Sequence, residues 1–259
     1  MSRDMWDPAV YGRYAGERAR PFFELLARVR AENPRSVVDL GCGSGELTAE
    51  LRRRWPEAYV HGIDSSPAMI AKAPPGPTFS VGDVRDWRPD HPIDVIISNA
   101  LLQWIPEHRE LFPRWLGYLA PGGWLAFQVP GNFDAPSHAA VRRLCASPVW
   151  AGRLGDLARY DPVDGPEGYL DLLAGLGCEV DAWETTYVHV LPGDDPVLAW
   201  ISGTALRPML DRLSGDEAAR AAFLADCARV LAEAYPRRPY GTAFPFRRVF
   251  VVARRPGRP

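Results

Sequence analysis

The sequence is poor in lysine and cysteine and carries little net charge. Lys72 is its single lysine, so nearly all of its positive charge is arginine, and the formal net charge of −2 offers no basic surface for nucleic acid. The four cysteines (Cys42, Cys145, Cys178 and Cys227) are far apart and form no C-x-x-C pair, which argues against a zinc site and a disulfide framework. We therefore expect no metal centre and no nucleic-acid partner.

Long apolar runs are also missing. No stretch approaches the ~20 consecutive apolar residues that a membrane span requires. Residues 1–6 are polar and lack the apolar centre of a signal peptide. We therefore expect a cytoplasmic protein with no membrane partner, whose oligomeric state the sequence does not indicate. Hydrophobic residues make up 47% of the 259 residues, which is enough for a core without disulfides or structural metals.

Strand-like and helix-like segments alternate in the first half of the chain. Short apolar runs predict strands, and the amphipathic segments between them predict helices. Strands are expected at 36–40, 59–63, 78–81, 93–98 and 124–129, and helices at 46–55, from 66 onward, and at 107–119. Alternation at this spacing is typical of βαβ units, and the right-handed crossover rule makes the resulting parallel sheet doubly wound.

The regular alternation of predicted strands and helices ends after Pro130. We expect one domain over residues 1–259, made of an N-terminal helical segment (1–34), a ligand-binding core (35–130), two helical insertions (131–176 and 195–236) and two final strands (177–190 and 247–253). Neither insertion has enough apolar residues for a core of its own. We therefore expect the two to form a lid over the carboxyl ends of the strands, where ligands bind in open α/β sheets.

A glycine-rich loop, Asp39-Leu40-Gly41-Cys42-Gly43-Ser44-Gly45, follows the first predicted strand. Such a loop lets the backbone approach a ligand closely, although glycines also end strands for purely structural reasons. Its G-x-G-x-G spacing differs from the dinucleotide pattern G-x-G-x-x-G, because Glu46 stands where the third glycine would be. A pyrophosphate there would meet a carboxylate. The loop therefore favours a ligand that has no phosphate and carries a sulfonium cation.

Two further carboxylates follow the next two predicted strands. Asp64 lies about 20 residues after the glycine loop, which is where a carboxylate accepts hydrogen bonds from both ribose hydroxyls. It could instead begin the next helix, but Ser66 before Pro67 is the better helix cap. Asp83 can accept from an adenine amine while the backbone of Val84 donates to a ring nitrogen; an exposed loop aspartate is the alternative.

Several spaced segments together resemble the class I S-adenosylmethionine-dependent methyltransferase family. They are Asp39–Gly45, Gly62-Ile63-Asp64-Ser65-Ser66, Gly82-Asp83-Val84, Ser98-Asn99-Ala100-Leu101-Leu102-Gln103-Trp104 and Leu119-Ala120-Pro121-Gly122-Gly123. The match spans about residues 35–130. It implies S-adenosylmethionine as cofactor and a Rossmann-like α/β fold with a doubly wound, seven-stranded, mostly parallel sheet and a reversed last strand. The cofactor-binding residues that we expect are Asp39, Gly41, Gly43, Gly45, Asp64, Ser65, Asp83, Val84, Asn99, Ala100 and, for the methionine carboxylate, Arg20 or its neighbour Arg18.

The rest of the chain is similar to members of that family that methylate a small tricarboxylic acid. The similar segments are Trp6-Asp7-Pro8, Glu17–Pro21, Gly62–Ala71, Leu102–Pro106, Gly177–Asp181, Thr185–Tyr187, Leu206–Pro208 and Phe250–Arg255. This resemblance implies methyl transfer to one carboxylate of trans-aconitate or a related small polycarboxylic acid. The products would be a monomethyl ester and S-adenosylhomocysteine.

A carboxylate acceptor simplifies the chemistry. It is ionised at neutral pH and attacks without a general base, so we expect no catalytic residue. The remaining carboxylates do need cationic or hydrogen-bonding partners. Arg207 is the first candidate, because its planar guanidinium can clamp a carboxylate. Further substrate-binding candidates are Tyr11, Tyr14, Trp104, Gln128, Asn132, Tyr187 and His189. Each has an alternative: a surface salt bridge for Arg207, packing for His189, and an amphipathic helix face for the tyrosines.

Three other functions stay open at this point. One is a methyltransferase of the same fold that acts on another small molecule with an oxygen, nitrogen or carbon nucleophile. Another is a nucleotide-dependent oxidoreductase, which Glu46 disfavours. The last is a protein that binds the cofactor without catalysis.

Overall fold

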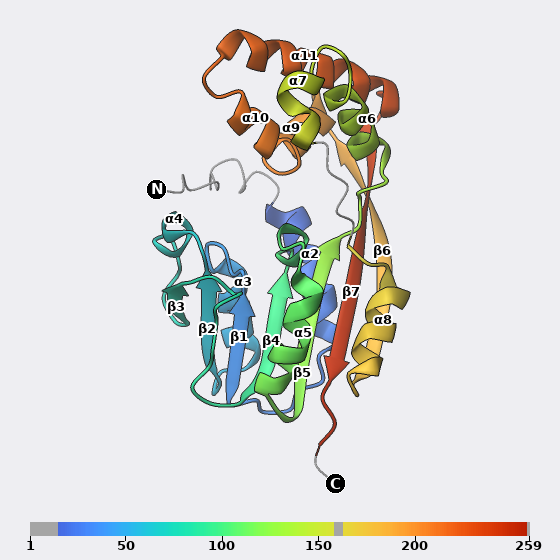
Figure 1. The fold of residues 1–259 in the computed structure, drawn as a ribbon. Coiled ribbons are helices and arrows are strands. Elements are labelled where there is room, and N and C mark those ends of the chain that lie inside the picture. Colours follow the sequence, from blue (N-terminus) through green and yellow to red (C-terminus); the bar gives the residue numbers. More distant parts are fainter. Residues whose placement is uncertain (1–14, 158–162, 258–259) are drawn as a thin grey trace. The chain divides into compact units, whose positions relative to one another are not determined.

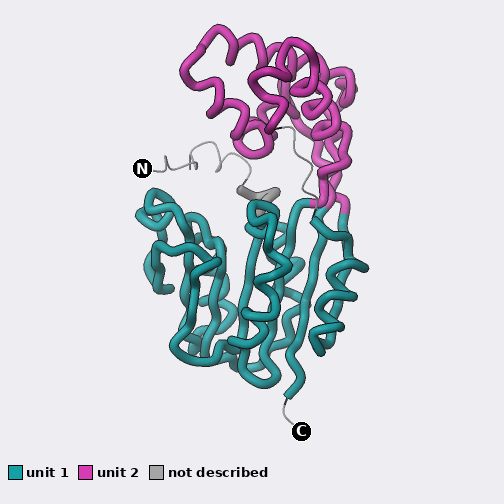
Figure 2. Tube along the Cα trace, viewed as in Figure 1, with its two compact units in different colours: residues 1–130, 163–185, 248–259 teal, residues 131–162, 186–247 magenta. Residues whose placement is uncertain are grey.

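The structure is a computed structural model that describes residues 15–157 and 163–257. The chain forms two compact units, coloured separately in Figure 2. Unit 1 comprises Met1–Pro130, Val163–Thr185 and Arg248–Pro259, and unit 2 comprises Gly131–Pro162 and Thr186–Arg247. The predicted single domain with a lid stays a prediction.

Unit 1 is built on a seven-stranded sheet in the order β3-β2-β1-β4-β5-β7-β6 (Figure 1). The strands are β1 (Ser36–Leu40), β2 (Tyr59–Asp64), β3 (Thr78–Val81), β4 (Ile93–Asn99), β5 (Leu119–Pro130), β6 (Glu179–Leu191) and β7 (Thr242–Arg254). The first five pair in parallel, and β7 pairs antiparallel with β5. The last two strands are long, and their residues divide between the two units. The predicted α/β fold with a reversed last strand is confirmed.

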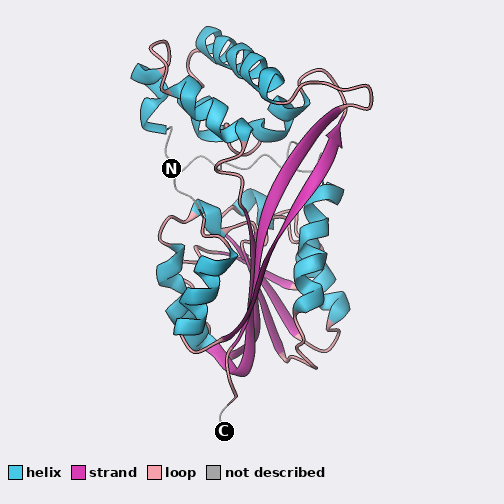
Figure 3. Ribbon diagram, turned by 90° about the vertical axis from the view of Figure 1, so that its right-hand side faces the viewer, coloured by secondary structure: helices cyan, strands magenta, loops and turns pink. Residues whose placement is uncertain are grey.

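Helices cover both faces of this sheet (Figure 3). Those of unit 1 are α2 (Ala15–Arg28), α3 (Glu46–Arg54), α4 (Pro67–Ile70), α5 (His108–Tyr118) and α8 (Pro166–Gly175), with a 3-10 turn at Leu102–Trp104. On one face, Phe112 of α5 stacks on Phe127 of β5 at 5.1 Å between ring centroids, and Tyr169 of α8 packs on Phe127 at 5.0 Å. Residues 163–176, which the sequence analysis grouped with the first insertion, thus contribute α8 to the core of unit 1.

Successive side chains along β5 and β7 point to opposite faces of the sheet, and the two faces have different surroundings. Phe127 and Val129 join the core on the α5 and α8 side. Gln128 lies opposite Phe250 in the register, and Phe250 stacks on Trp183, which in turn lies under the guanidinium of Arg28 in α2. Since side chains alternate between the faces of a strand, Gln128 faces the α2 side of the sheet.

Unit 2 consists of four helices of ten residues or fewer, the 18-residue helix α11, and the remaining parts of β6 and β7. Its helices are α6 (Pro136–Cys145), α7 (Ala151–Leu154), α9 (Pro196–Ser202), α10 (Arg207–Arg212) and α11 (Glu217–Ala234), with a 3-10 turn at Gly155–Leu157. The two insertions share a core: Trp150 of the first packs on Phe223 of the second at 5.1 Å between ring centroids. Tyr235, at the end of α11, packs on Phe244 of β7 at 5.2 Å. Each insertion taken alone has too few apolar residues for a core, and the shared core was not predicted from the sequence.

Two expected absences can be compared with the described residues. None of the helices in 15–157 or 163–257 is long and apolar enough to cross a membrane. Within the same residues, no three or more His, Cys, Asp or Glu side chains gather in a way that could hold a metal ion.

Candidate functional site

The glycine loop connects β1 to α3 at the carboxyl edge of the sheet. Gly41, Gly43 and Gly45 have φ angles of 77°, 56° and 76°, in the region that residues with a Cβ rarely adopt. The amides of Gly41 and Cys42 both donate to the carbonyl oxygen of Ile63, at 2.8 and 3.0 Å. The loop is therefore anchored to β2 and presents a fixed stretch of backbone.

The three glycines meet different surroundings. A Cβ at Gly45 would lie 2.5 Å from Cε1 of Phe79, and one at Gly41 would lie 2.8 Å from Cβ of Leu101. A Cβ at Gly43 would meet no described atom within 4 Å. Gly41 and Gly45 thus allow close packing within the protein, whereas Gly43 leaves bare backbone open to a ligand. This arrangement fits the predicted cofactor loop.

Asp39, at the end of β1, is a buried carboxylate with one uncommitted oxygen. Its Oδ2 accepts a hydrogen bond from Thr48 Oγ1 at 2.6 Å, while Oδ1 is buried and has no partner among the described residues. Burial raises the pKa of Asp39 to about 6; the bond from Thr48 lowers it, and the nearby charge of Asp64 raises it further. A cation bound beside Oδ1 would favour the ionised form.

Asp64 holds the loop in place from the end of β2. Its Oδ2 accepts from the amide of Gly43 and its Oδ1 from the amide of Ser66, both at 2.9 Å. Ser66 caps α4 by accepting from the amide of Met69, so the predicted helix cap is confirmed. Each carboxylate oxygen of Asp64 can accept a second hydrogen bond. Its predicted contact with ribose hydroxyls is compatible with this geometry, and neighbouring Ser65 is exposed.

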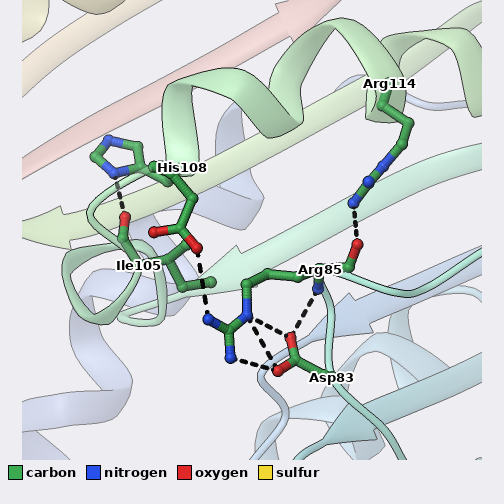
Figure 4. Close-up of polar contacts among 6 residues, drawn as sticks. Asp83, Arg85, Ile105, His108 and Arg114 are labelled. Atoms are coloured by element: carbon green, nitrogen blue, oxygen red, sulfur yellow. Dashed lines mark hydrogen bonds and ion pairs between the residues drawn. The ribbon is translucent and has the colours of Figure 1, made fainter.

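Asp83, after β3, forms an ion pair with Arg85, which was not predicted from the sequence. Arg85 clamps its carboxylate, with Nη2 2.6 Å from Oδ2 and Nε 3.0 Å from Oδ1 (Figure 4). Arg85 also reaches Glu107 at 3.4 Å. The bonds from Arg85 lower the pKa of Asp83. Val84 packs into the core of unit 1, so only its backbone can serve a ligand. A contact of Asp83 with adenine stays a prediction.

The backbone at the end of β4 is strained. Ala100 has a φ of 59°, and besides Asn33 it is the one non-glycine residue in the described part of the chain with a positive φ. Its amide donates to the carbonyl of Gln128 at 2.9 Å, and its own carbonyl accepts from the side chain of Gln103. Such strain costs about 1–3 kcal/mol and tends to occur at functional sites. The position of Ala100 supports its predicted place in the cofactor site.

Three polar side chains form a row beside Ala100, from the ends of β4 and β5 to the middle of β7. Arg248 Nη1 donates to Gln128 Oε1 at 3.2 Å, and Gln128 Nε2 donates to Asn99 Oδ1 at 2.6 Å. Arg248 is only 7% exposed and Gln128 only 1%. Arg248 was missed from the sequence. A signal was present, because residue 248 shares its face of β7 with the apolar residues 250 and 252, an unusual place for an arginine.

Comparisons with known proteins can now be set beside this geometry. A profile of the methyltransferase domain family matches residues 11–163. A trans-aconitate 2-methyltransferase of Streptomyces coelicolor is 55% identical over 264 residues, covering 97% of this chain and 87% of that protein. A second protein of that name, from Mycobacterium sp. (strain KMS), is 56% identical over 254 residues, covering 96% and 99%. The chain belongs to the trans-aconitate 2-methyltransferase family.

The fold of this family is also found in more distant solved structures. Phosphoethanolamine N-methyltransferase 2 of Haemonchus contortus, in complex with S-adenosyl-L-methionine, is 17% identical with a TM-score of 0.53; the match covers 92% of this chain and 52% of that chain. At such an identity the likeness concerns the fold alone. The resemblance inferred from the sequence motifs, and the Rossmann-like fold that it implied, are both confirmed.

The remaining candidates of unit 1 lie on two helical segments. In this member of the trans-aconitate 2-methyltransferase family, Trp104 ends the 3-10 turn after β4 and is 39% exposed. Arg20, on the exposed side of α2, forms an ion pair with Glu24 at 2.9 Å. The assignment of Arg20 to the methionine carboxylate stays a prediction. Tyr11 and Tyr14 lie outside the described residues.

The candidates of unit 2 differ in how they are held. Arg207 begins α10, and its Nε lies 3.3 Å from Oδ1 of Asp211. Asn132 makes reciprocal hydrogen bonds with the backbone of Arg247, at 2.8 and 3.0 Å, which is a structural contact. Tyr187 is buried against His189, whose ring also packs on Trp200 with centroids 4.7 Å apart. Packing, the alternative role for His189, is thus present.

Proposed function

We propose that this protein transfers a methyl group from S-adenosylmethionine to one carboxylate of trans-aconitate or a related small polycarboxylic acid. The products are a monomethyl ester and S-adenosylhomocysteine. The observation that carries the proposal is the identity of 55% with a trans-aconitate 2-methyltransferase over 97% of the chain, including both insertions. Substrate choice in such enzymes resides in residues outside the shared fold, so similarity over the insertions supports the same acceptor.

The glycine loop and its two carboxylates fit the cofactor. Gly43 offers open backbone, and Asp64 fixes the amide of that residue while keeping acceptor capacity for hydroxyl groups. The free oxygen of Asp39 provides negative charge without a protein partner among the described residues. Glu46 begins α3 where a phosphate would otherwise be attracted. A ligand that has hydroxyls and a positive charge but no phosphate suits these groups.

Methyl transfer to a carboxylate requires no general acid or base from the protein. Bound S-adenosylmethionine supplies an electrophilic methyl group on a sulfonium. The acceptor carboxylate is already ionised at neutral pH, so no proton has to be removed from it. The chain's residues have to bind the acid, orient one oxygen toward the methyl group and exclude water. His108 illustrates why we assign no base: its Nδ1 contacts the carbonyl of Ile105 and its Nε2 the hydroxyl of Tyr169, both in the core.

An acceptor panel tests this proposal. The purified protein and S-adenosylmethionine are incubated with trans-aconitate, cis-aconitate, citrate and isocitrate, and in parallel with small amines and phenols. We expect S-adenosylhomocysteine to form with trans-aconitate or a related acid, together with an ester that mild base hydrolyses. Turnover of an amine or a phenol with no turnover of any acid would contradict the proposal.

Arg207 gives a second prediction, for the acid-binding side of the site. We expect Arg207→Ala to raise the KM for the acid by about tenfold or more, because a charged hydrogen-bonding partner of a carboxylate is lost. The affinity for S-adenosylhomocysteine should stay nearly unchanged. Arg212→Ala is the matched control, since Arg212 lies on the same helix α10 and pairs with Asp156 at 2.9 Å. Equal losses for acid and cofactor, or equal effects of both variants, would place Arg207 outside the acid site.

A further inference from the structure

The hydrogen bonds in the row of Arg248, Gln128 and Asn99 are all donated in the same direction, from Arg248 toward Asn99. An arginine side chain can only donate hydrogen bonds, so the amide of Gln128 must turn its oxygen toward Arg248. The nitrogen of Gln128 then points to Asn99, which must in turn offer its own oxygen. The orientation of an amide group is usually inferred from its neighbours. Here the guanidinium of Arg248 fixes the orientation of the Gln128 amide, which in turn fixes that of the Asn99 amide. Nδ2 of Asn99 then points away from Gln128 and can donate to another group.

Asn99 lies where a ligand would be within reach. It is the last residue of β4, and β4 pairs with β1, whose end carries the glycine loop, through Leu40 and Ser98. Nδ2 of Asn99 makes no hydrogen bond within residues 15–157 and 163–257, and the residue is partly exposed. The following residue is the strained Ala100. A free donor is thus presented at the edge of the sheet where the cofactor loop begins.

We propose that Nδ2 of Asn99 donates a hydrogen bond to a carboxylate oxygen of a bound ligand, and that Gln128 and Arg248 are positioning residues for this donor. Hydrogen bonds in a chain polarise one another, and a chain that starts at a cation ends in a strengthened donor. An anionic oxygen is the acceptor that gains most from it. Two carboxylate ligands are available if the proposed function holds: the acid acceptor and the amino-acid end of the cofactor.

Two substitutions of Gln128 separate this role from a merely structural one. Gln128→Glu keeps an acceptor for Arg248 but can no longer donate to Asn99, so the Asn99 amide turns and presents its oxygen to the ligand. Gln128→Leu removes both bonds and leaves Arg248 without this partner, but it does not reverse Asn99. The two variants are close in size to the wild type. Gln128→Glu also adds a negative charge, which the adjacent guanidinium of Arg248 compensates.

The proposal predicts opposite rankings in two measurements. In thermal unfolding, Gln128→Leu should melt several degrees below Gln128→Glu, because a buried donor of Arg248 loses its acceptor. The affinity for the carboxylate ligand should rank the other way. Gln128→Glu should lower this affinity by more than about tenfold, because it turns the oxygen of Asn99 toward an anion. Gln128→Leu should lower it less, because it does not turn Asn99. If Gln128 had only a structural role, the less stable variant, Gln128→Leu, would also have the lower affinity for the carboxylate ligand.

Three probes identify the carboxylate and keep this test apart from that of the proposed function. Binding of S-adenosylhomocysteine and of 5′-methylthioadenosine, which lacks the amino-acid end, is measured by calorimetry, and the KM is measured for trans-aconitate. If Gln128→Glu binds S-adenosylhomocysteine more weakly than the wild type does but binds methylthioadenosine equally well, Asn99 contacts the carboxylate of the cofactor. If only the KM for trans-aconitate increases, Asn99 contacts the acid. If the wild type methylates no acid, the proposed function fails, while the two calorimetric titrations still test Asn99.

Two results would overturn the inference. One is wild-type affinity of Gln128→Glu for both carboxylate ligands. The other is a loss of affinity in Gln128→Leu that equals or exceeds the loss in Gln128→Glu, in parallel with its lower stability.

Discussion

Replacing Gly43 by alanine is expected to lower the affinity for S-adenosylhomocysteine by about a hundredfold, equivalent to about 3 kcal/mol, while the protein stays folded. The Cβ of an alanine here would meet no described atom, so the fold itself has room for it. The φ of 56° adds strain of about 1–2 kcal/mol. The methyl group would, however, occupy the space through which the cofactor approaches the loop. Calorimetric titration and thermal unfolding of the variant check both halves of this expectation.

Two other glycines serve as matched controls. Gly76 also has a positive φ, of 118°, and open space where a Cβ would lie, but it is outside the loop, so Gly76→Ala should cost some stability and leave cofactor affinity unchanged. Gly45→Ala should mainly destabilise the protein, because its Cβ would overlap the ring of Phe79 at 2.5 Å. If Gly43→Ala bound the cofactor as well as Gly76→Ala does, the open backbone at Gly43 would not be the cofactor cradle.

Asp39→Asn should make the protein more stable and its cofactor binding weaker. Burial raises the pKa of Asp39 from 3.8 to about 6, so keeping this group ionised at neutral pH costs about 3 kcal/mol of stability. The folded state holds the proton more tightly than the unfolded state. Stability therefore falls as the pH rises from about 4 to about 6, and the full cost is present above that range. An asparagine oxygen can still accept from Thr48, so the variant escapes this cost and loses the pH dependence.

The functional half of this prediction uses the charge of the cofactor. S-adenosylmethionine carries a sulfonium and S-adenosylhomocysteine does not. Removing the negative charge of Asp39 should therefore weaken binding of the former more than of the latter. Denaturant unfolding from pH 4 to pH 8 and titration with both ligands measure the two effects. A variant that is less stable than the wild type at neutral pH, or that loses affinity equally for both ligands, would contradict this account of Asp39.

Local signals in the sequence were enough to predict the first five strands and the glycine loop that follows the first of them. A short, mostly apolar run such as residues 36–40 favours a strand buried on both faces, and all five residues of β1 are buried. The glycine spacing and the helix cap at Ser66 depend on neighbours within a few positions. The positions of Asp39, Gly43 and Asp64 followed from the strand ends, because the carboxyl ends of parallel strands meet at one edge.

Features that depend on distant partners could not be predicted. The hydrogen bond between Arg248 and Gln128 joins residues 120 positions apart. The apolar neighbours of Arg248 mark it as unusual, but no local pattern indicates that Gln128 is its partner. β7 begins at Thr242 instead of residue 247. Its first residues were missed because Pro245 is an unusual residue inside a strand. β5 begins at Leu119, before Gly122 and Gly123, although glycines usually end an element. The clamp of Arg85 on Asp83 was near in sequence, but which of several charges would pair depends on the path of the loop.

Carboxyl methylation is the central claim, and the position of the transferred methyl group tests it most directly. The protein is incubated with trans-aconitate and S-adenosylmethionine that carries ¹³C in its methyl group, and the product is followed by NMR. The account predicts one labelled methyl ester on the acid, correlated with a carboxyl carbon and lost as methanol in mild base. A label that stays on the cofactor, or that appears on carbon or on a hydroxyl of an acceptor, would contradict it.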